Sequence, residues 1–236
     1  MRESQTDNPQ SLEILEQEVI NCRKCPRLVE YREKVAKEKR RAYREWTYWG
    51  KPIPGFGDPN TQLFILGLAP AAHGGNRTGR AFTGDRSGDF LYAALYEAGF
   101  ANQPTSVHRD DGLQLKNAFI AATVRCAPPA NKPLPSEILN CRGYLERELA
   151  LLKPKVVLAL GKIAWDAYLD ILKIDGVIAS RAKFLFGHGA EAQPPGGGPR
   201  LVGVYHPSQQ NTQTGRVTAD MYTRVLRRVR TLLEGQ

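Results

Sequence analysis

Apolar residues in this chain alternate between short unbroken runs and longer helical stripes. The runs have the length of strands buried on both faces, and Lys155-Val-Val-Leu-Ala-Leu160 is the clearest of them. Strands that alternate with helices indicate a parallel sheet covered on both faces. The sequence therefore predicts an α/β fold, a three-layer α/β/α sandwich with a central four-stranded, mostly parallel sheet. The expected strands are residues 62–67, 118–123, 155–160 and 200–205, and the expected helices are residues 86–99, 136–152, 162–172 and 217–233.

The first part of the chain does not follow this alternation. Residues 1–60 are expected to form an extension packed on a main domain of residues 61–236. Residues 1–8 look loose, and residues 9–20 carry a helical pattern. Near the other end, residues 187–199 are rich in Gly and Pro without periodicity, which predicts a loop.

A basic run and three aromatic residues lie within the extension. The segment from Arg32 to Arg44 holds seven Lys and Arg against two Glu. It indicates either a solvated helix face or an arm that contacts phosphates. Trp46, Tyr48 and Trp49 follow it, and they suit either stacking on nucleic-acid bases or packing against the core. The sequence leaves both questions open.

Composition narrows the class of protein. The chain has 236 residues, of which 42% are hydrophobic, so a globular fold with a sizeable core is expected. No apolar run reaches the length of a membrane span, and the polar first residues are unlike a signal peptide, so we expect a cytoplasmic protein without membrane contact. The net charge of +9 favours an anionic partner such as nucleic acid, although a charge that only serves solubility has the same sign.

The four cysteines are unevenly spaced along the chain. Cys22 and Cys25 make a CxxC pair, whereas Cys126 and Cys141 have fourteen residues between them, unlike the second knuckle of a zinc ribbon. A disulfide is not expected in a reducing compartment. If the fold brings the four together, an iron–sulfur cluster or a structural zinc fits them. The alternative is four free thiols.

One glycine-rich stretch, residues 67–85, stands between an apolar run and a helical stripe. It is not a P-loop, because no Gly-Lys-Ser/Thr follows the glycines, and its glycine spacing is not that of a dinucleotide-binding fold. Two other polar loops, residues 125–133 and 206–216, also follow predicted strands. Because the carboxyl ends of parallel strands lie at one edge of a sheet, the three loops are expected to meet there.

These loops carry a resemblance. They read Gly67-Leu-Ala-Pro-Ala-Ala-His-Gly, Gly79-Arg-Ala-Phe-Thr-Gly-Asp, Cys126-Ala-Pro-Pro-Ala-Asn-Lys-Pro and Tyr205-His-Pro-Ser. Together with the four cysteines, they resemble the type-5 uracil-DNA glycosylases from about Cys22 to Val229. The resemblance implies a monofunctional enzyme that hydrolyses the glycosidic bond of uracil in DNA by base flipping, with hypoxanthine and xanthine as further substrates. It also implies one 4Fe–4S cluster per subunit, held by all four cysteines, and a monomer.

The resemblance assigns the catalytic roles to Asp85, His206 and Asn131. Asp85 would steady the cationic sugar and orient water, although an Asp before a helix is also a common N-cap. His206 would donate to the base oxygen and Asn131 would contact the base edge, the alternatives being a core histidine and a turn residue. Other branches of the superfamily carry an acidic or amide residue in the turn where this chain has Leu68 and Ala69, and that change adds weight to Asp85 and leaves room for purines.

The remaining roles form two sets. His73 is expected to contact either the base pocket or a phosphate. Phe82 is expected to stack on the base, although a Phe between glycines is often core filler. The pocket set is Gly67, Leu68, Ala69, Pro70, His73 and Phe82. The DNA-binding set, for phosphates and for the gap left by the flipped base, is Arg77, Arg80, Lys132, Ser208, Gln209, Gln210, Asn211, Thr212 and Arg216.

Two rival functions remain open at this stage. One is a non-catalytic nucleic-acid-binding module with a structural metal. The other is a hydrolase of free nucleosides that binds DNA weakly. Release of uracil from DNA would separate both from a DNA glycosylase.

Overall fold

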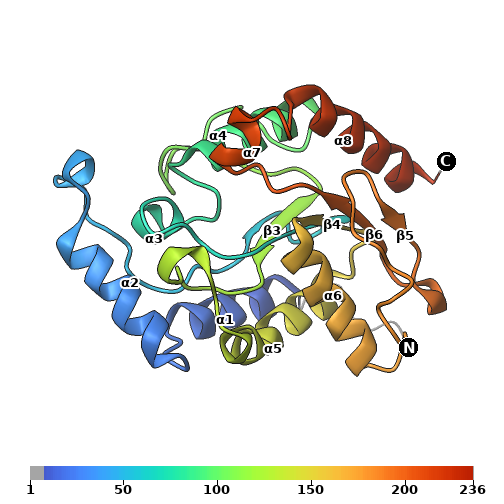
Figure 1. Ribbon diagram of the computed structural model, residues 1–236, viewed down its shortest axis with the longest axis horizontal. Coiled ribbons are helices and arrows are strands. Elements are labelled where there is room, and N and C mark those ends of the chain that lie inside the picture. Colours follow the sequence, from blue (N-terminus) through green and yellow to red (C-terminus); the bar gives the residue numbers. More distant parts are fainter. Residues whose placement is uncertain (1–7, 236) are drawn as a thin grey trace.

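The computed structural model describes residues 8–235 and shows one mixed sheet between two layers of helices (Figure 1). The α/β prediction is confirmed, but the sheet has six strands rather than four, in the order β1-β3-β2-β4-β6-β5. The four inner strands pair in parallel, and a two-residue antiparallel strand is added at each edge. Such short strands leave no alternation of side chains to detect in a sequence. The strands are β1 Phe56–Gly57, β2 Leu63–Gly67, β3 Ala118–Ala122, β4 Val156–Leu160, β5 Glu191–Ala192 and β6 Arg200–Val204.

Strand β2 shows how the core is divided. Its side chains alternate between the two faces, so Leu63 and Ile65 pack in one core and Phe64 and Leu66 in the other. Helices α4 and α8 cover the first face, and α5 and α6 cover the second (Figure 1). A strand buried on both faces needs an unbroken apolar run, as the sequence has here.

The predicted helices are present within two or three residues of their expected ends. Two segments differ from the prediction. Residues 187–199 contain β5 and a short 3₁₀ helix, and residues 209–213, expected in a loop, form the exposed helix α7. The predicted loose segment, residues 1–8, lies outside the described residues except for its last one. The helices are α1 Asn8–Ile20, α2 Pro26–Glu38, α3 Gly75–Thr78, α4 Arg86–Glu97, α5 Pro135–Leu152, α6 Lys162–Ile174, α7 Gln209–Gln213 and α8 Ala219–Glu234, with 3₁₀ turns η1 Arg41–Tyr43, η2 Pro129–Asn131 and η3 Pro195–Gly197.

The N-terminal helices pack on the second face of the sandwich. Leu15 and Val19 of α1 are fully buried against Tyr144 of α5. Helix α2 leads from there to η1, which stands at one end of the molecule (Figure 1). Within residues 8–235, no helix combines the length and the apolar character that crossing a bilayer requires.

Candidate active site

A cavity of about 410 Å³ lies where the loops after β2, β3 and β6 meet, as the topology requires. The side chains of Asp85, Asn131 and His206 all line it, although up to 121 residues separate them in sequence. Most of its wall is apolar, which suits a flat ring. The lining residues are Leu68, Ala69, Pro70, Ala71, Ala81, Phe82, Asp85, Ser87, Ala122, Asn131, His206, Ser208, Gln209 and Gln210.

Asp85 precedes helix α4 and is its N-cap. Its Oδ1 accepts a hydrogen bond from the backbone N–H of Gly88 at 3.0 Å. Burial raises the pKa of the carboxyl group, while backbone N–H groups of Gly88 and Ser87 and the charge of Arg77 oppose the rise. The cap and the catalytic assignment are therefore compatible, because one oxygen caps the helix and the carboxyl group still lines the cavity.

Two glycines make room for Asp85 and Phe82. A Cβ on Gly74 would stand 2.0 Å from Oδ2 of Asp85, and a Cβ on Gly88 would stand 1.8 Å from the carbonyl oxygen of Phe82. Phe82 itself has a φ of 51°, a strained value for a residue with a side chain. Its ring lies over Gly67, where a Cβ would come within 2.9 Å. The glycines of this stretch thus serve close packing around two cavity residues.

His206 follows β6 and faces Phe82 across the cavity, with 5.9 Å between the ring centroids and 33° between the planes. Burial lowers the pKa of His206 to about 4. The imidazole is therefore neutral near pH 7 and can donate one N–H to an oxygen without carrying a charge. Asn211 in α7 holds the backbone here, because its Nδ2 donates to the carbonyl of His206 at 2.8 Å.

Asn131 ends the 3₁₀ turn η2 with a φ of 55°, a left-handed value that Asn adopts more readily than most residues. Its side chain is exposed and lines the cavity. In the described part of the chain, its amide has no protein hydrogen-bond partner. The amide therefore keeps its donor and its acceptor for a ligand.

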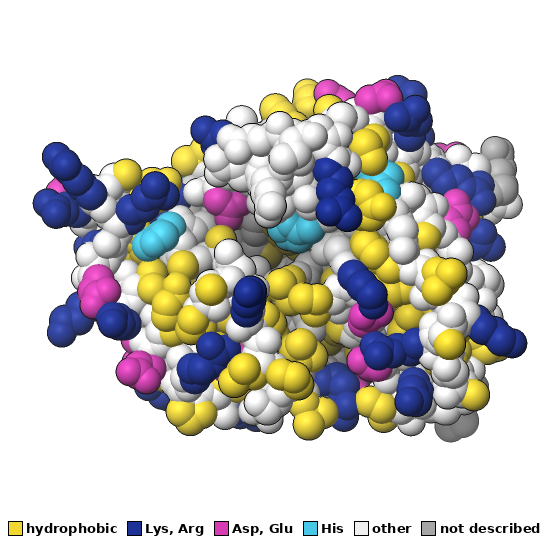
Figure 2. Space-filling model, viewed as in Figure 1, with side chains coloured by type: hydrophobic (Ala, Val, Ile, Leu, Met, Phe, Trp, Pro, Cys, Tyr) yellow, Lys and Arg dark blue, Asp and Glu magenta, His cyan; other side chains and the backbone are white. Residues whose placement is uncertain are grey.

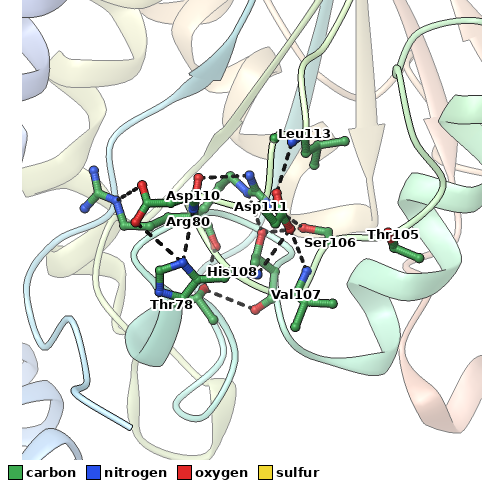
Figure 3. A network of polar contacts seen from close by, with 12 residues as sticks. Thr78, Arg80, Thr105, Ser106, Val107, His108, Asp110, Asp111 and Leu113 are labelled. Atoms are coloured by element: carbon green, nitrogen blue, oxygen red, sulfur yellow. Dashed lines mark hydrogen bonds and ion pairs between the residues drawn. The ribbon is translucent and has the colours of Figure 1, made fainter.

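A buried network holds the loop that carries Asp85 (Figure 3). The Nη2 of Arg80 donates to both carboxylate oxygens of Asp111 at 2.8 Å and to the Ser106 hydroxyl at 2.9 Å, and its Nε donates to the Thr83 hydroxyl at 2.9 Å. The carbonyl of Ser106 in turn accepts from Gly84 N at 2.9 Å, next to Asp85. Arg80 is only 4% exposed, so the prediction that it holds a DNA phosphate is wrong. It fixes the loop instead.

Arg77 is committed to protein partners in the same way. It donates to the carbonyls of His73 at 2.8 Å and of Gly84 at 2.7 Å. The rings of Tyr43 and Trp46 lie 3.9 Å and 4.0 Å from its guanidinium carbon. With 3% exposure, Arg77 is not available to a phosphate, and this second part of the phosphate prediction is also wrong. A sequence shows that an arginine is basic but not whether acceptors of its own chain surround it.

The aromatic residues of the extension pack against protein groups. Tyr48 is buried, and its hydroxyl lies 3.0 Å from Nδ1 of His73. Trp49 donates its indole N–H to the carbonyl of Pro52 at 3.0 Å. Of the two interpretations left open by the sequence, the structure favours core packing over base stacking. His73 is turned to Tyr48 and does not line the cavity, which corrects its assignment to the base pocket.

The other DNA-binding predictions concern exposed or half-buried residues around helix α7. Ser208 caps α7 by accepting from Asn211 N, and Gln209 and Gln210 line the cavity. Thr212, Lys132 and Arg216 lie outside the cavity lining, and the last two are exposed. For these residues, DNA contact stays a prediction. Sequence reasoning missed the small lining residues Ala71, Ala81, Ser87 and Ala122, since nothing distinguishes them from ordinary core or cap positions.

The four cysteines converge. All of them line one small cavity between α2, α5 and the loop after β3, and all are free thiols. Burial raises the pKa of the Cys126 and Cys141 thiols. Within residues 8–235, no group of three or more Cys, His, Asp or Glu side chains is arranged to hold a metal ion. The structure thus shows a set of sulfur donors but no formed metal site.

A buried arginine adjoins these thiols. The Nη1 of Arg32 lies 2.9 Å from the Sγ of Cys126, and its Nε has no partner. The carboxylate nearest to it in the described chain, that of Glu33, is 3.9 Å away, half exposed, and pairs with Arg23 at 2.6 Å. Burying a charge without a close counter-ion is costly. Thiolates around a metal would supply the missing negative charge, so the donor set and Arg32 fit a metal–thiolate centre.

Comparison with known proteins agrees with this geometry. Residues 54–230 match the profile of the Uracil DNA glycosylase superfamily. Type-5 uracil-DNA glycosylases from Mycobacterium leprae and Thermus thermophilus are 51% and 48% identical to this chain, over 92% and 91% of it and 93% and 94% of their own lengths. A type-4 uracil-DNA glycosylase from Archaeoglobus fulgidus is 25% identical over 84% of this chain and 82% of its own. This chain belongs to the uracil-DNA glycosylase superfamily.

Proposed function

We propose that this protein is a monofunctional uracil-DNA glycosylase that hydrolyses the bond between uracil and deoxyribose and leaves an abasic site. The observation that carries the proposal is the convergence of Asp85, Asn131 and His206 on one cavity with Phe82 in its wall. The match of 177 residues to the superfamily profile, 54 to 230, supports it. Because a base inside a duplex cannot reach such a cavity, the nucleotide has to flip out of the stack.

Each of these four side chains has a role in the reaction. As the glycosidic bond breaks, its electron pair goes to the base, and positive charge develops on the sugar. Ionised Asp85 stabilises that sugar and orients the water that attacks it. As the new C–O bond forms, the water's proton passes by way of the Asp85 carboxylate to the base anion, which leaves as the neutral base. Neutral His206 donates to the base oxygen where negative charge grows. The Asn131 amide bonds the base edge, and Phe82 stacks on its face.

We propose that hypoxanthine and xanthine are substrates as well. Leu68 and Ala69 line the cavity where a polar side chain would read one base, and Ala71 and Ala81 leave further space. Apolar walls discriminate weakly between rings of similar shape, because they offer no group that a wrong base leaves unpaired. Selectivity would then come from Asn131 and His206, whose partners on uracil also exist on the deaminated purines.

We propose that Cys22, Cys25, Cys126 and Cys141 hold one 4Fe–4S cluster. Their shared cavity and the buried guanidinium of Arg32, whose Nε has no partner and whose nearest carboxylate in the described residues is 3.9 Å away, support it. A bound cluster would cross-link helix α2 to helix α5 and take no part in base release. Residues 1–60 would then be an extension fastened to the main domain, residues 61–236. We propose that the enzyme acts as a monomer in the cytoplasm.

The direct test is a base-release panel with uracil, hypoxanthine and xanthine in single- and double-stranded DNA, scored by alkaline cleavage at abasic sites. We expect release of all three bases and no strand cleavage without alkali. Binding of DNA without base release would favour a nucleic-acid-binding module. Hydrolysis of free deoxyuridine alone would favour a nucleoside hydrolase.

The cluster has its own test. The purified protein should hold about four iron and four acid-labile sulfide per chain and absorb visible light through its sulfur-to-iron bands. Arg32→Met should lower this iron content, whereas Arg23→Met, at an exposed site, should not. One zinc per chain without visible absorbance would overturn the proposal.

A further inference from the structure

A short basic segment projects at one end of the molecule. Residues 39–49 follow helix α2 and contain the turn η1, and we call this segment the arm. The side chains of Arg40, Arg41 and Arg44 are exposed, and none of them has a carboxylate partner in the described part of the chain. Arg142 and Arg147 form ion pairs, whereas Arg86, Arg216 and Arg227 also lack a carboxylate partner in the described residues. The arm gathers three such arginines within five residues.

The arm is fixed to the protein despite its exposure. The guanidinium of Arg77 lies over the rings of both Tyr43 and Trp46, which meet edge to face. Trp46 also lies 5.7 Å, between ring centroids, from His108 in the loop that Arg80 anchors. Cation–π contacts to a buried guanidinium are among the stronger ones, because water does not compete for it. Thus the arm presents its arginines from a rigid base.

A second set of contacts joins the arm to the glycine-rich stretch. The backbone N–H of Trp49 donates to the carbonyl of Arg77 at 2.9 Å, and that of Gly50 donates to Asn76 at 3.0 Å. The Tyr48 hydroxyl, which accepts from Arg40 N, bonds His73. Helix α3, which receives these contacts, belongs to the loop that carries Asp85. The arm therefore holds a fixed position relative to the base cavity.

Figure 2 shows the arm and the cavity on one face of the molecule. Basic side chains gather at the left end of this face, where Figure 1 places the tip beyond α2. The hollow with an acidic and a histidine side chain lies near the centre, below α7. A DNA strand that places a nucleotide in the hollow can extend across α3 towards the arm.

We propose that the arm is a phosphate-binding surface, in which Arg40, Arg41 and Arg44 bind the DNA backbone on the α3 side of the flipped nucleotide. The inference rests on the proposed function for the orientation of the strand. Arginine forks bind phosphate oxygens in pairs, and groups without internal partners do so without breaking an existing bond. Helix α7 borders the cavity on its other side, so the extruded nucleotide would be held from both flanks.

The test replaces Arg40, Arg41 and Arg44 with Gln together. The probe is a fluorescein-labelled 30-base-pair duplex without uracil, with binding measured by anisotropy between 50 and 200 mM salt. Each lost phosphate contact lowers the log–log salt slope by about 0.9, so we expect a decrease of about 2 to 3 and a Kd at least about tenfold higher at low salt. With a uracil-containing duplex, kcat/KM should fall more than kcat.

Two variants control for the charge itself and for its position on the molecule. Replacing the same three residues with Lys should keep most of the salt slope, because Lys also binds phosphate as a point charge. Replacing Lys173, Lys183 and Arg227, exposed residues of α6, the loop after it and α8, with Gln removes the same charge far from the arm and should change the Kd less than about twofold.

The proposal is overturned if the arm variant and the distant variant change the slope equally. An arm that binds an acidic protein instead of DNA would give this result. Failure of the proposed function looks different, because a protein that releases no base can still show the full salt slope on the duplex without uracil. The binding series and the base-release panel therefore fail separately.

Discussion

The two sides of the base cavity are built differently. On one side, the loop with Asp85 is held by the buried guanidinium groups of Arg77 and Arg80 and by glycines in close contact. On the other side, Asn131, Gln209 and Gln210 are exposed, and few hydrogen bonds fix their side chains. One side is rigid before DNA arrives, and the other keeps free polar groups.

This difference follows what each side has to do. A carboxylate that stabilises developing charge is useful only if it needs no rearrangement when that charge appears, and a buried network supplies this at a cost in stability. Amide groups that meet DNA of any sequence benefit from freedom to adapt. Contacts within the protein therefore fix the position of the carboxylate. The groups that read the base find their hydrogen-bond partners only on the substrate.

The largest effect is expected for Asp85→Asn. Loss of the charge should reduce base release by about 10²- to 10³-fold, as for other single electrostatic groups in active sites. Stability should rise near pH 7: because burial raises the folded-state pKa, ionisation opposes folding above pH 3.8, and Asn removes this penalty while keeping the cap. Single-turnover kinetics and thermal melting measure both. Full activity would reduce Asp85 to a helix cap.

Asp111→Ala should give the largest loss of stability. Burial alone would raise the Asp111 pKa, but Arg80 and the backbone N–H groups of Leu113, Val107 and His108 outweigh it and lower the pKa. Removing the carboxylate leaves Arg80 buried without its partner, which should lower the free energy of unfolding by about 3 kcal/mol. Urea unfolding gives the value. Asp110→Ala, one residue earlier and exposed, is the matched control, and an equal loss there would refute the special role of the network.

A smaller effect is expected on the exposed side. Gln210→Ala should slow base release from double-stranded DNA by about three- to tenfold, because filling the gap offsets part of the cost of flipping, a few kcal/mol. Base release from single-stranded DNA should slow less, because a single strand has no duplex gap to fill. Gln213→Ala, on the same helix but outside the cavity, is the control. Equal effects on both substrates would contradict this account of α7.

The pH dependence should show no contribution from His206 between pH 6 and 7. Its pKa of about 4 lies below the ordinary value of 6.5, so the folded imidazole stays neutral down to about pH 4. Because the unfolded chain binds this proton first, folded stability is lost as pH falls from 6.5 to about 4. The acid limb of the rate profile should come from Asp85, whose activity is lost as pH falls through its raised pKa. An inflection near pH 6.5 that disappears in His206→Asn would show that His206 titrates normally.

The sequence predicted those features that depend on the spacing of apolar residues. The apolar runs of β2 and β4 and the stripes of α5 and α6 recur in the structure nearly as predicted, because burial on two faces or one leaves a clear periodicity. The roles predicted for Arg77, Arg80 and His73 were wrong, because the partners of these residues come from loops that only the fold brings into contact. Sequence reasoning also missed Gly74, which matters only because Asp85 packs against it.

By itself, the sequence determined the α/β class, the three loops at one sheet edge and the residue types that can break a glycosidic bond. Only the tertiary structure decided that Asp85, Asn131 and His206 share one cavity, that two arginines support a loop, and that three others remain without partners on the arm. The physical reason is that periodicity is local, whereas burial and pairing depend on groups brought together from distant parts of the chain.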